Sequence, residues 1–276
     1  MYSHGLRWIV FTVDYMRWDA IRLKPHNQHF RAGFFLFQSV CGVLKEPHVG
    51  LNSLKYTFRS MRAFMEDTTY LVIATRNPGK TAEIRELLKG FPLQIGNIED
   101  FGPIPEVEED GQTFEENAYK KASFTARVLG LPALADDSGL VVETLGGAPG
   151  VYSARFAGDH ATDADRCARL LADMEGKTDR RAAFECVISI AVPTGQALTY
   201  EARCEGMIAE KPVGRNGFGY DPIFYYPPLK KTFAELTRAE KSHISHRGNA
   251  LSELKREMEK VLIWIRQHMP VFEKFH

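Results

Sequence analysis

The stretch Thr75-Arg76-Asn77-Pro78-Gly79-Lys80 decides how the chain begins to fold. It follows an apolar run at 70–74 that predicts a buried strand, and it leads into a predicted helix at 80–88. A strand that breaks at Asn-Pro-Gly and continues as a helix leaves backbone N–H groups unpaired at the helix start. The helix dipole and Lys80 then make this corner attractive to anions, above all to phosphates.

Helix and strand patterns alternate after this corner. Thr113 and Glu116 form a capping box for a helix that stops at Gly130. Further helices are predicted at 162–174 and 245–268, and further strands at 93–98, 132–135, 182–192 and 197–208. The last two strands alternate well enough to form a long antiparallel pair. The pattern therefore predicts an α/β fold with a long mixed sheet and helices on both sides.

Composition limits the classes of function. The chain has 276 residues, of which 25% are charged and 44% apolar, as in a globular protein with a well-buried core. Residues 65–276 hold 26 basic and 32 acidic side chains, and this acidic balance argues against a nucleic-acid partner. The cysteines show no C-x-x-C pair, which favours reduced thiols in a cytoplasmic protein. No apolar run reaches the length of about 20 residues that a membrane helix needs.

Residues 1–64 differ from the rest of the chain. They hold nine basic and three acidic side chains, and 12 of the 31 aromatic residues, without a sustained helix or strand rhythm. Three interpretations compete: a targeting segment, an accessory element, or a start site assigned too far upstream. We favour the last, with 1–64 as a poorly ordered or artefactual extension and 65–276 as the functional domain. Protein starting at Met65 is expected to keep full activity.

Two adjacent carboxylates, Asp136 and Asp137, stand at the predicted end of the strand at 132–135. Neighbouring side chains of an extended strand face opposite ways, so one carboxylate can bind a metal while the other reaches a second target. Carboxylate and water ligands suit Mg²⁺, which joins proteins to substrate phosphates. The alternative is a solvated turn at Asp-Ser-Gly. Lys80 and Lys121 shift the balance, because a triphosphate carries roughly four negative charges that need cations.

Two further segments suit a nucleotide base. In the segment 216–222, a glycine on each side of Phe218 lets the backbone approach a ligand and exposes the ring, while Asp221 can accept hydrogen bonds from a base. The alternative is a tight turn with a core Phe. In the segment 241–247, Lys and Arg are donors only, so they favour a 6-oxo group over a 6-amino group. The alternative there is a basic helix cap at Ser245.

Six ordered segments resemble the inosine/xanthosine triphosphate pyrophosphatases in order and spacing. They are 75–80, 113–118, 135–140, 146–155, 218–222 and 245–247. The resemblance covers about 69–268. It implies two lobes flanking a nucleotide cleft, a homodimer, and Mg²⁺-dependent hydrolysis of dITP, ITP and XTP to the monophosphate and pyrophosphate.

The resemblance also implies residue roles. Asp137 would accept a proton and bind the metal, and Glu109 with Asp136 would complete the metal environment; an alignment choice leaves Glu108 open as a substitute for Glu109. The remaining positions would contact substrate: Thr75, Arg76, Asn77, Pro78, Gly79 and Lys80 of the first loop, although the family varies at Arg76 and Pro78; then Lys121, Ser138, Phe218, Gly219, Tyr220, Asp221, Lys241, His246 and Arg247.

Three other functions fit the sequence less well. A P-loop NTPase requires a glycine where Ala74 stands. A non-catalytic nucleotide binder would not need the Asp136-Asp137 pair. A sister group of pyrophosphatases with a similar fold acts on modified pyrimidine or methylated guanine nucleotides, whereas the donors in 241–247 favour 6-oxopurines.

Overall fold

The computed structural model describes residues 69–270, and every structural statement below refers to them. The predicted extension at 1–64 lies outside the described residues, so its interpretation stays a prediction.

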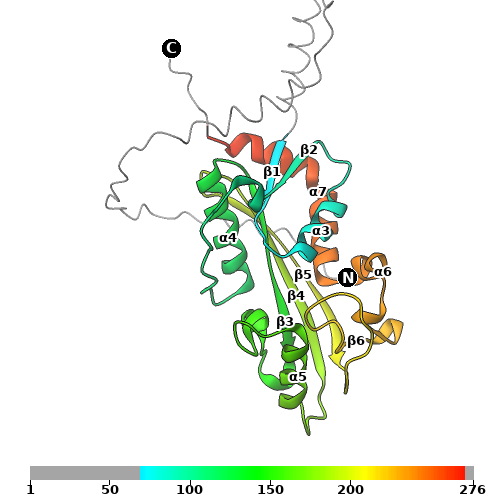
Figure 1. Cartoon of the computed structure of the whole chain (residues 1–276). Coiled ribbons are helices and arrows are strands. Elements are labelled where there is room, and N and C mark those ends of the chain that lie inside the picture. The colour runs from blue at the N-terminus through cyan, green and yellow to red at the C-terminus, as the bar shows by residue number, and fades with distance from the viewer. Residues whose placement is uncertain (1–68, 271–276) are drawn as a thin grey trace, which may run out of the picture. The chain divides into compact units, whose positions relative to one another are not determined.

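A seven-stranded mixed sheet organises the described residues (Figure 1). The strand order is β2-β1-β3-β4-β5-β6-β7, with β2, β1 and β3 parallel and the later pairs antiparallel. The strand bounds are Thr69–Ile73 (β1), Leu93–Asn97 (β2), Ala133–Val142 (β3), Arg181–Ala191 (β4), Ala197–Ile208 (β5), Phe224–Tyr226 (β6) and Lys231–Thr232 (β7). The predicted mixed sheet and the long antiparallel pair β4–β5 are confirmed.

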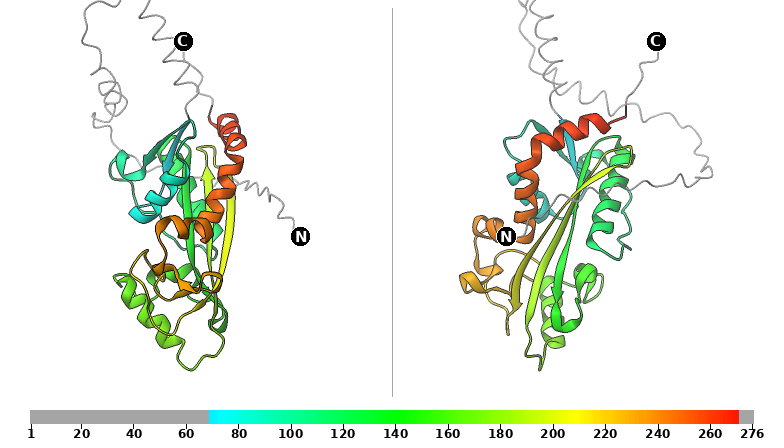
Figure 2. Two further views of the ribbon diagram at one scale, coloured as in Figure 1. Left: turned by 90° about the vertical axis from the view of Figure 1, so that its right-hand side faces the viewer. Right: turned by 180° about the vertical axis from the view of Figure 1, so that it is seen from behind.

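Helices lie on both faces of the sheet (Figure 2). Their bounds are Pro78–Leu87 (α3), Phe114–Leu129 (α4), Asp163–Asp173 (α5), Arg238–Ile244 (α6) and His246–His268 (α7). Buried side chains of α3 and α7 pack on one face against Leu71, Ile73 and Leu134. Alanines of α4 pack on the other face against alternate residues of the same strands, including Val72 and Ala133. The predicted α/β fold is therefore confirmed.

Capping residues set the ends of two of these helices as the sequence predicted. The Thr113 hydroxyl accepts a hydrogen bond from the Glu116 N–H at 3.1 Å, and Gly130 ends α4 in the left-handed region with φ of 66°. Ser245 caps α7 by accepting from the Gly248 N–H at 3.1 Å. The sequence did not predict α6, which a capping box at Thr237 and Glu240 begins.

Strand β3 does not end at Asp136, and that prediction is wrong. The pairing with β4 continues through Asp136↔Ile188 and Gly139↔Glu185 to Val142↔Ala182. Ser-Gly is turn chemistry in isolation, but the long antiparallel ladder satisfies the backbone here and overrides local preference. The carboxylates thus stand in the middle of a strand rather than in a turn.

The chain connections place a topological switch point of the sheet beside these carboxylates. The register of β1 with β3 stops at Ile73↔Leu134, after which β1 leads into α3. The neighbours of β1 are β2, reached through α3, and β3, reached later through α4. The crevice beyond the carboxyl end of such a strand is where open α/β sheets bind ligands. Asp136 and Asp137 come directly after that point on β3.

We expect α7 to stabilise the fold mainly through the side chains that it packs against the sheet. Leu251 is fully buried in the cluster that joins α7 to the sheet, whereas Ile263 on the same helix is 54% exposed. Leu251→Ala should lower the free energy of unfolding by about 2–5 kcal/mol, because it leaves a cavity in that cluster. The matched change Ile263→Ala should cost about 0.5 kcal/mol or less apart from helix propensity. Urea denaturation measures both, and equal losses would contradict this packing.

Candidate active site

Strand alternation sends the adjacent carboxylates of β3 to opposite faces of the sheet. Asp136 faces α3 and α7, where it contacts Lys80 and Arg247. Asp137 faces α4, where it contacts Lys121. Both are buried, with side chains 0% and 8% exposed respectively. Two buried anions next to each other in sequence can therefore coexist, because each has a cation of its own.

Asp136 is held ionised by its neighbours. The Lys80 Nζ and the Arg247 Nη2 each lie 3.0 Å from its Oδ2. Burial alone would raise the pKa of this carboxyl, but the charges of Lys80, Arg247 and Lys121 outweigh burial and hold the pKa below its ordinary value. The second oxygen, Oδ1, is buried and has no hydrogen-bond partner among the described residues. Such an atom is an acceptor with unused capacity.

Asp137 has a different environment. The Lys121 Nζ lies 2.8 Å from its Oδ1, and the buried Asn117 donates to its Oδ2 at 3.3 Å. Burial raises the pKa of Asp137 above its ordinary value, against the opposing charge of Lys121. A carboxylate with a raised pKa is a better proton acceptor. The same Lys121 ammonium lies 2.9 Å from the Glu109 carboxylate, so Glu109 rather than Glu108 contacts this group.

The loop before α3 is built by local hydrogen bonds. Asn77 caps the helix by accepting from the N–H groups of Gly79 and Lys80 at 2.9 and 3.2 Å, and Pro78 occupies the first turn. Thr75 in turn accepts from the Asn77 N–H at 3.2 Å. Two N–H groups that the sequence suggested were free for an anion are therefore used by the Asn77 side chain. Lys80 is the group of this corner that points toward the carboxylates.

Arg76 takes a direction that the sequence did not predict. Its guanidinium donates to the Ile104 carbonyl at 2.6 Å and pairs with the Glu106 carboxylate. Both partners belong to the acidic loop, which we define as residues 103–111. Arg76 thus ties the loop before α3 to the acidic loop.

The Phe218 loop lies against the same corner. Gly217 and Gly219 both have positive φ, 77° and 64°, so the turn requires glycine on each side of the ring. A Cβ added to Gly79 would come within 3.3 Å of the Phe218 ring. The start of α3 and the Phe218 loop, some 140 residues apart in sequence, are therefore neighbours.

Cations surround the Phe218 ring. The Lys241 Nζ lies 4.8 Å from the ring centroid, and the Arg247 Cζ lies 5.7 Å from it. Asp221 accepts a hydrogen bond from the Phe218 N–H at 2.9 Å and pairs with Lys241, which comes from the unpredicted helix α6. Burial raises the pKa of Asp221, against the lowering effect of Lys241.

His246 and Arg247 are the first two residues of α7, and Arg247 reaches the Phe218 ring. His246 stacks on Phe184 with centroids 4.7 Å apart, and its Nδ1 is buried without a partner among the described residues. Burial, followed by the charges of Arg247 and Lys241, lowers its pKa well below the ordinary value, so the imidazole is neutral. Arg247 donates to the Ser138 hydroxyl at 2.8 Å and to Glu83 at 2.7 Å.

Two predicted substrate-contact residues form hydrogen bonds to other parts of the protein instead. Tyr220 is 3% exposed, and its hydroxyl donates to the Ser153 carbonyl at 2.9 Å. The Gly219 N–H donates to Asp163 at 2.6 Å. Sequence reasoning missed two residues that contact the site, Glu83 and Asn117. Glu83 stands three residues after Lys80, which puts it on the same helix face, and that spacing could have indicated it.

The residues present fit a hydrated divalent cation rather than a closed metal cage. Within residues 69–270, no three His, Cys, Asp or Glu side chains converge as a complete metal site. Mg²⁺ does not require one, because it takes one or two carboxylates and completes its shell with water and substrate phosphates. Asp136 Oδ1 is an unused buried acceptor, and Glu109 and Asp137 already converge on a single cation, Lys121. The donor set therefore suits Mg²⁺.

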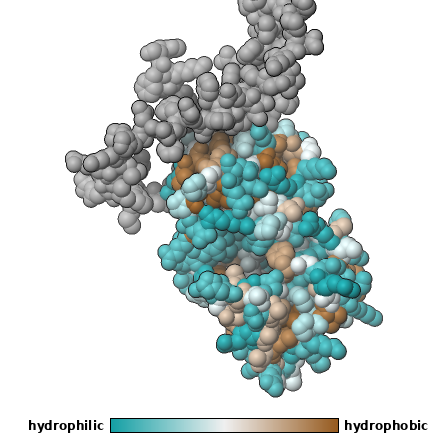
Figure 3. Space-filling view, viewed as in Figure 1, coloured by the Kyte–Doolittle hydropathy of each residue, from teal (hydrophilic) through white to brown (hydrophobic). Residues whose placement is uncertain are grey.

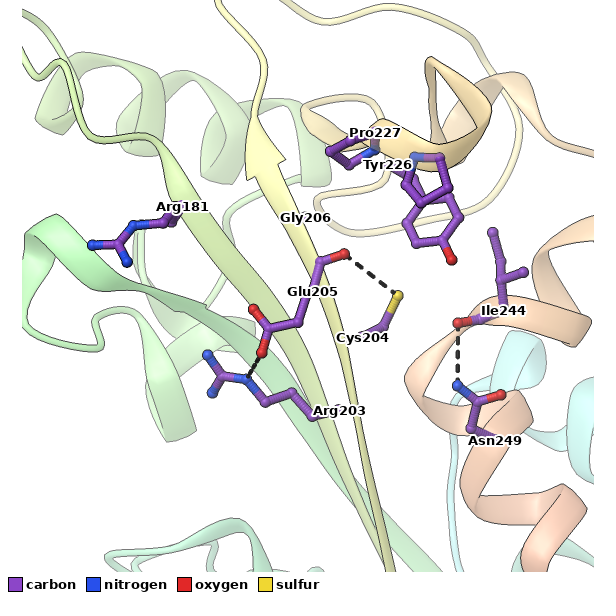
Figure 4. Close-up of a pocket in the computed structure, with 10 residues that line it drawn as sticks. Arg181, Arg203, Cys204, Glu205, Gly206, Tyr226, Pro227, Ile244 and Asn249 are labelled. Atoms are coloured by element: carbon purple, nitrogen blue, oxygen red, sulfur yellow. Dashed lines mark hydrogen bonds and ion pairs between the residues drawn. The ribbon is translucent and has the colours of Figure 1, made fainter. Parts of the chain in front are cut away.

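A separate cavity of about 440 Å³ lies between β5 and the junction of α6 with α7 (Figure 4). Cys204, Tyr226, Ile244 and Asn249 line it, and none of the predicted site residues does. Burial raises the pKa of the Cys204 thiol to about 12, which favours the protonated thiol near neutral pH. Figure 3 shows the molecule from the viewpoint of Figure 1, and hydrophilic residues predominate over the middle of this face.

Comparison with known proteins shows the family of the chain. The sequence model of the Ham1 family matches residues 71–257. The chain belongs to the Ham1 family. It is 63% identical to a dITP/XTP pyrophosphatase of Syntrophobacter fumaroxidans over 195 residues, which cover 71% of this chain and 84% of the relative. It is 55% identical to a dITP/XTP pyrophosphatase of Desulfotalea psychrophila over 199 residues, which cover 72% and 89%.

Solved Ham1 structures share the fold. The Ham1 protein of Coxiella burnetii is 45% identical, with a TM-score of 0.67 over 70% of this chain and all of that chain. The Ham1 protein of Staphylococcus aureus is 43% identical, with a TM-score of 0.65 over the same shares. The family predicted from the six segments is thus confirmed, as is the prediction of an enzyme of the pyrophosphatase class. None of the described helices is long and apolar enough to cross a membrane.

Lys121 occupies the position between two carboxylates that a divalent cation would share, and this yields a test. Lys121→Met should raise the affinity for Mn²⁺ in the absence of nucleotide by about tenfold, because it removes a competing charge at close range. The same variant should bind ITP more weakly. Lys120→Met is the matched control, because Lys120 pairs with the exposed Asp110 and carries the same charge. Electron paramagnetic resonance measures free Mn²⁺, and weaker Mn²⁺ binding by Lys121→Met would refute the competition.

Proposed function

We propose that this protein hydrolyses the deaminated purine nucleotides dITP, ITP and XTP to the monophosphate and pyrophosphate, with Mg²⁺ as cofactor, and so cleanses the nucleotide pool. We further propose that it does so in the cytoplasm as a homodimer, as the family resemblance implies. The names of its Ham1 relatives support the substrates. The observation that supports the proposal is one cluster of contacts, in which the carboxylates of Asp136 and Asp137 meet Lys80 and Lys121, and Arg247 contacts both Asp136 and the Phe218 ring.

The Phe218 end of the crevice suits the base. The Phe218 ring offers a face for stacking, and Lys241 and Arg247 approach it as donors. Donor-only groups favour a carbonyl at the 6-position of a purine and disfavour the 6-amino group of adenine. The neutral His246 adds a ring nitrogen, Nδ1, that has no hydrogen-bond partner within residues 69–270. The chemistry of this end therefore supports recognition of hypoxanthine and xanthine.

The opposite end suits the phosphates. Lys80 and Lys121 neutralise carboxylates in the absence of substrate. Phosphate oxygens are equivalent partners for these ammonium groups, so substrate binding is an exchange of partners that leaves no buried charge unpaired. Asp136, Asp137 and Glu109 would hold Mg²⁺. That ion supplies charge neutralisation along the triphosphate and acidifies a nearby water.

Asp137 is the residue that best suits proton transfer. Lys121 and Asn117 orient its carboxylate. The raised pKa of Asp137 makes this carboxylate a better acceptor for the proton of an attacking water. Attack at the α-phosphorus releases pyrophosphate, whose charge Lys80 and Lys121 offset as it leaves. Arg247 fixes Ser138 and Asp136 on the facing side, which links the base end of the crevice to the phosphate end.

A pyrophosphate-release screen tests the function. ITP, dITP and XTP are expected to yield pyrophosphate in the presence of Mg²⁺ and to yield none after chelation with EDTA. ATP, CTP and UTP are expected to react far more slowly. Release of inorganic phosphate would favour an NTPase, and a preference for modified pyrimidine or methylated guanine nucleotides would favour the sister group of similar fold. Nucleotide binding without turnover would leave a binding protein.

Replacement of the proton acceptor tests the mechanism. Asp137→Asn should lower kcat for ITP by a factor of about 10² to 10⁴, the usual contribution of a general base, while KM stays close to that of the unmodified protein. Asp173→Asn is the control, because Asp173 only forms a surface pair with Arg169. A loss of about twofold in Asp137→Asn would remove Asp137 from this role.

A further inference from the structure

The acidic loop, residues 103–111, has no secondary structure of its own although it carries Glu109. Among the described residues, no backbone–backbone hydrogen bond outside regular elements reaches it. Only Ile104 and Gly111 of the loop are buried, and the Glu109 side chain is 37% exposed. Neither a ladder nor burial therefore fixes the Glu109 carboxylate beside Asp137. Its position comes instead from side chains: the Lys121 ammonium contacts the Glu109 and Asp137 carboxylates at 2.9 and 2.8 Å, and other side chains hold the main chain of the loop.

Three side chains reach the main chain of this loop. Arg76 donates to the Ile104 carbonyl at 2.6 Å, and Asn117 accepts from the Gly111 N–H at 2.8 Å. These two bonds hold the ends of the loop. The Arg155 Nη2 donates to the carbonyl of Glu109 itself at 3.0 Å. Among the described residues, Arg155 is thus the side chain that holds the backbone of Glu109 itself.

Arg155 connects the acidic loop to β3. It ends the short 3₁₀ helix η4 (Gly150–Arg155), which is bound to β3 through Ser153. The Ser153 hydroxyl accepts from the Leu140 N–H at 2.9 Å and donates to the Gly150 carbonyl at 2.6 Å. Leu140 and Asp137 belong to the same strand. The Arg155 guanidinium also lies over the Tyr152 ring at 4.9 Å, which limits its orientations.

We propose that Arg155 is a positioning residue that holds the main chain of Glu109 so that the carboxylates of Glu109 and Asp137 stay side by side, and that it thereby sets the affinity for the divalent cation. The inference rests on the proposed function, because it assigns Glu109 to that cation. Arg155 itself touches neither carboxylate in the structure; it acts through the backbone. Partners that orient a metal ligand typically contribute about 10- to 100-fold to metal affinity.

Metal binding by the full-length protein tests this role without turnover. Arg155→Met keeps an apolar stem against Tyr152 but removes the donor, and it should weaken Mn²⁺ binding, followed by electron paramagnetic resonance without nucleotide, by about tenfold or more. Arg155→Lys keeps a single donor and should recover part of the loss. Arg180→Met is the matched control: the Arg180 guanidinium also donates to backbone carbonyls, those of Ile208 and Ala209 at 2.6 and 2.8 Å, and neither belongs to the acidic loop.

A double-variant cycle separates positioning from a general structural role. In a Glu109→Gln background, Arg155→Met should change Mn²⁺ affinity by less than about twofold, because the carboxylate on which it acts is gone. In the unmodified background, the Mg²⁺ concentration for half-maximal pyrophosphate release should rise, while kcat at saturating Mg²⁺ stays within about twofold.

Two outcomes would overturn the proposal: unchanged Mn²⁺ and Mg²⁺ constants in Arg155→Met, or an equal loss in both backgrounds. If Arg155→Met does not fold, as judged by circular dichroism, Arg155→Lys decides by the same constants. Failure of the proposed function gives a different result, since the unmodified protein would then release no pyrophosphate at any Mg²⁺ concentration while the Mn²⁺ comparison still stands.

Discussion

Two buried carboxylates on successive residues of one strand are the constraint on which the site depends. Asp136 and Asp137 can both be ionised in the interior only because strand alternation separates them and because each meets its own cation, Lys80 or Lys121. Those cations come from α3 and α4, which lie on opposite faces of the sheet. Apolar packing sets α3 and α4 on the two faces of the sheet, and the buried pair depends on the lysines that these helices carry.

The same constraint explains how so many charged side chains can be buried together at the candidate site. Every buried cation of the site already has a carboxylate partner: Lys80 and Arg247 share Asp136, Lys121 bridges Glu109 and Asp137, and Lys241 pairs with Asp221. A metal–triphosphate complex presents both signs of charge, so it can replace these pairs one for one. Removal of one partner alone leaves a buried charge uncompensated, which is the costly case.

The acidic loop extends this logic to a segment without regular structure. Its ends and Glu109 are each held through backbone groups by a side chain from elsewhere, namely Arg76, Asn117 and Arg155. The carboxylates of the loop pair separately with cations: Glu106 with Arg76, Glu109 with Lys121 and Asp110 with Lys120. The backbone bonds tie the loop to the segment before α3, to α4 and to η4.

The sequence by itself determined the family, the α/β fold and most of the residues that meet in the crevice, because motif spacing, strand rhythm and caps such as Thr113 and Ser245 are local signals. Only the tertiary structure decided that β3 runs on through Asp136 and Asp137, that Asn77 uses two N–H groups of its helix, that Glu83 contacts Arg247 and that Arg155 contacts the Glu109 carbonyl. The reason is that these outcomes depend on partners distant in sequence: the β4 ladder overrides turn chemistry, and a side chain's orientation follows from whichever charge or carbonyl the fold brings near it.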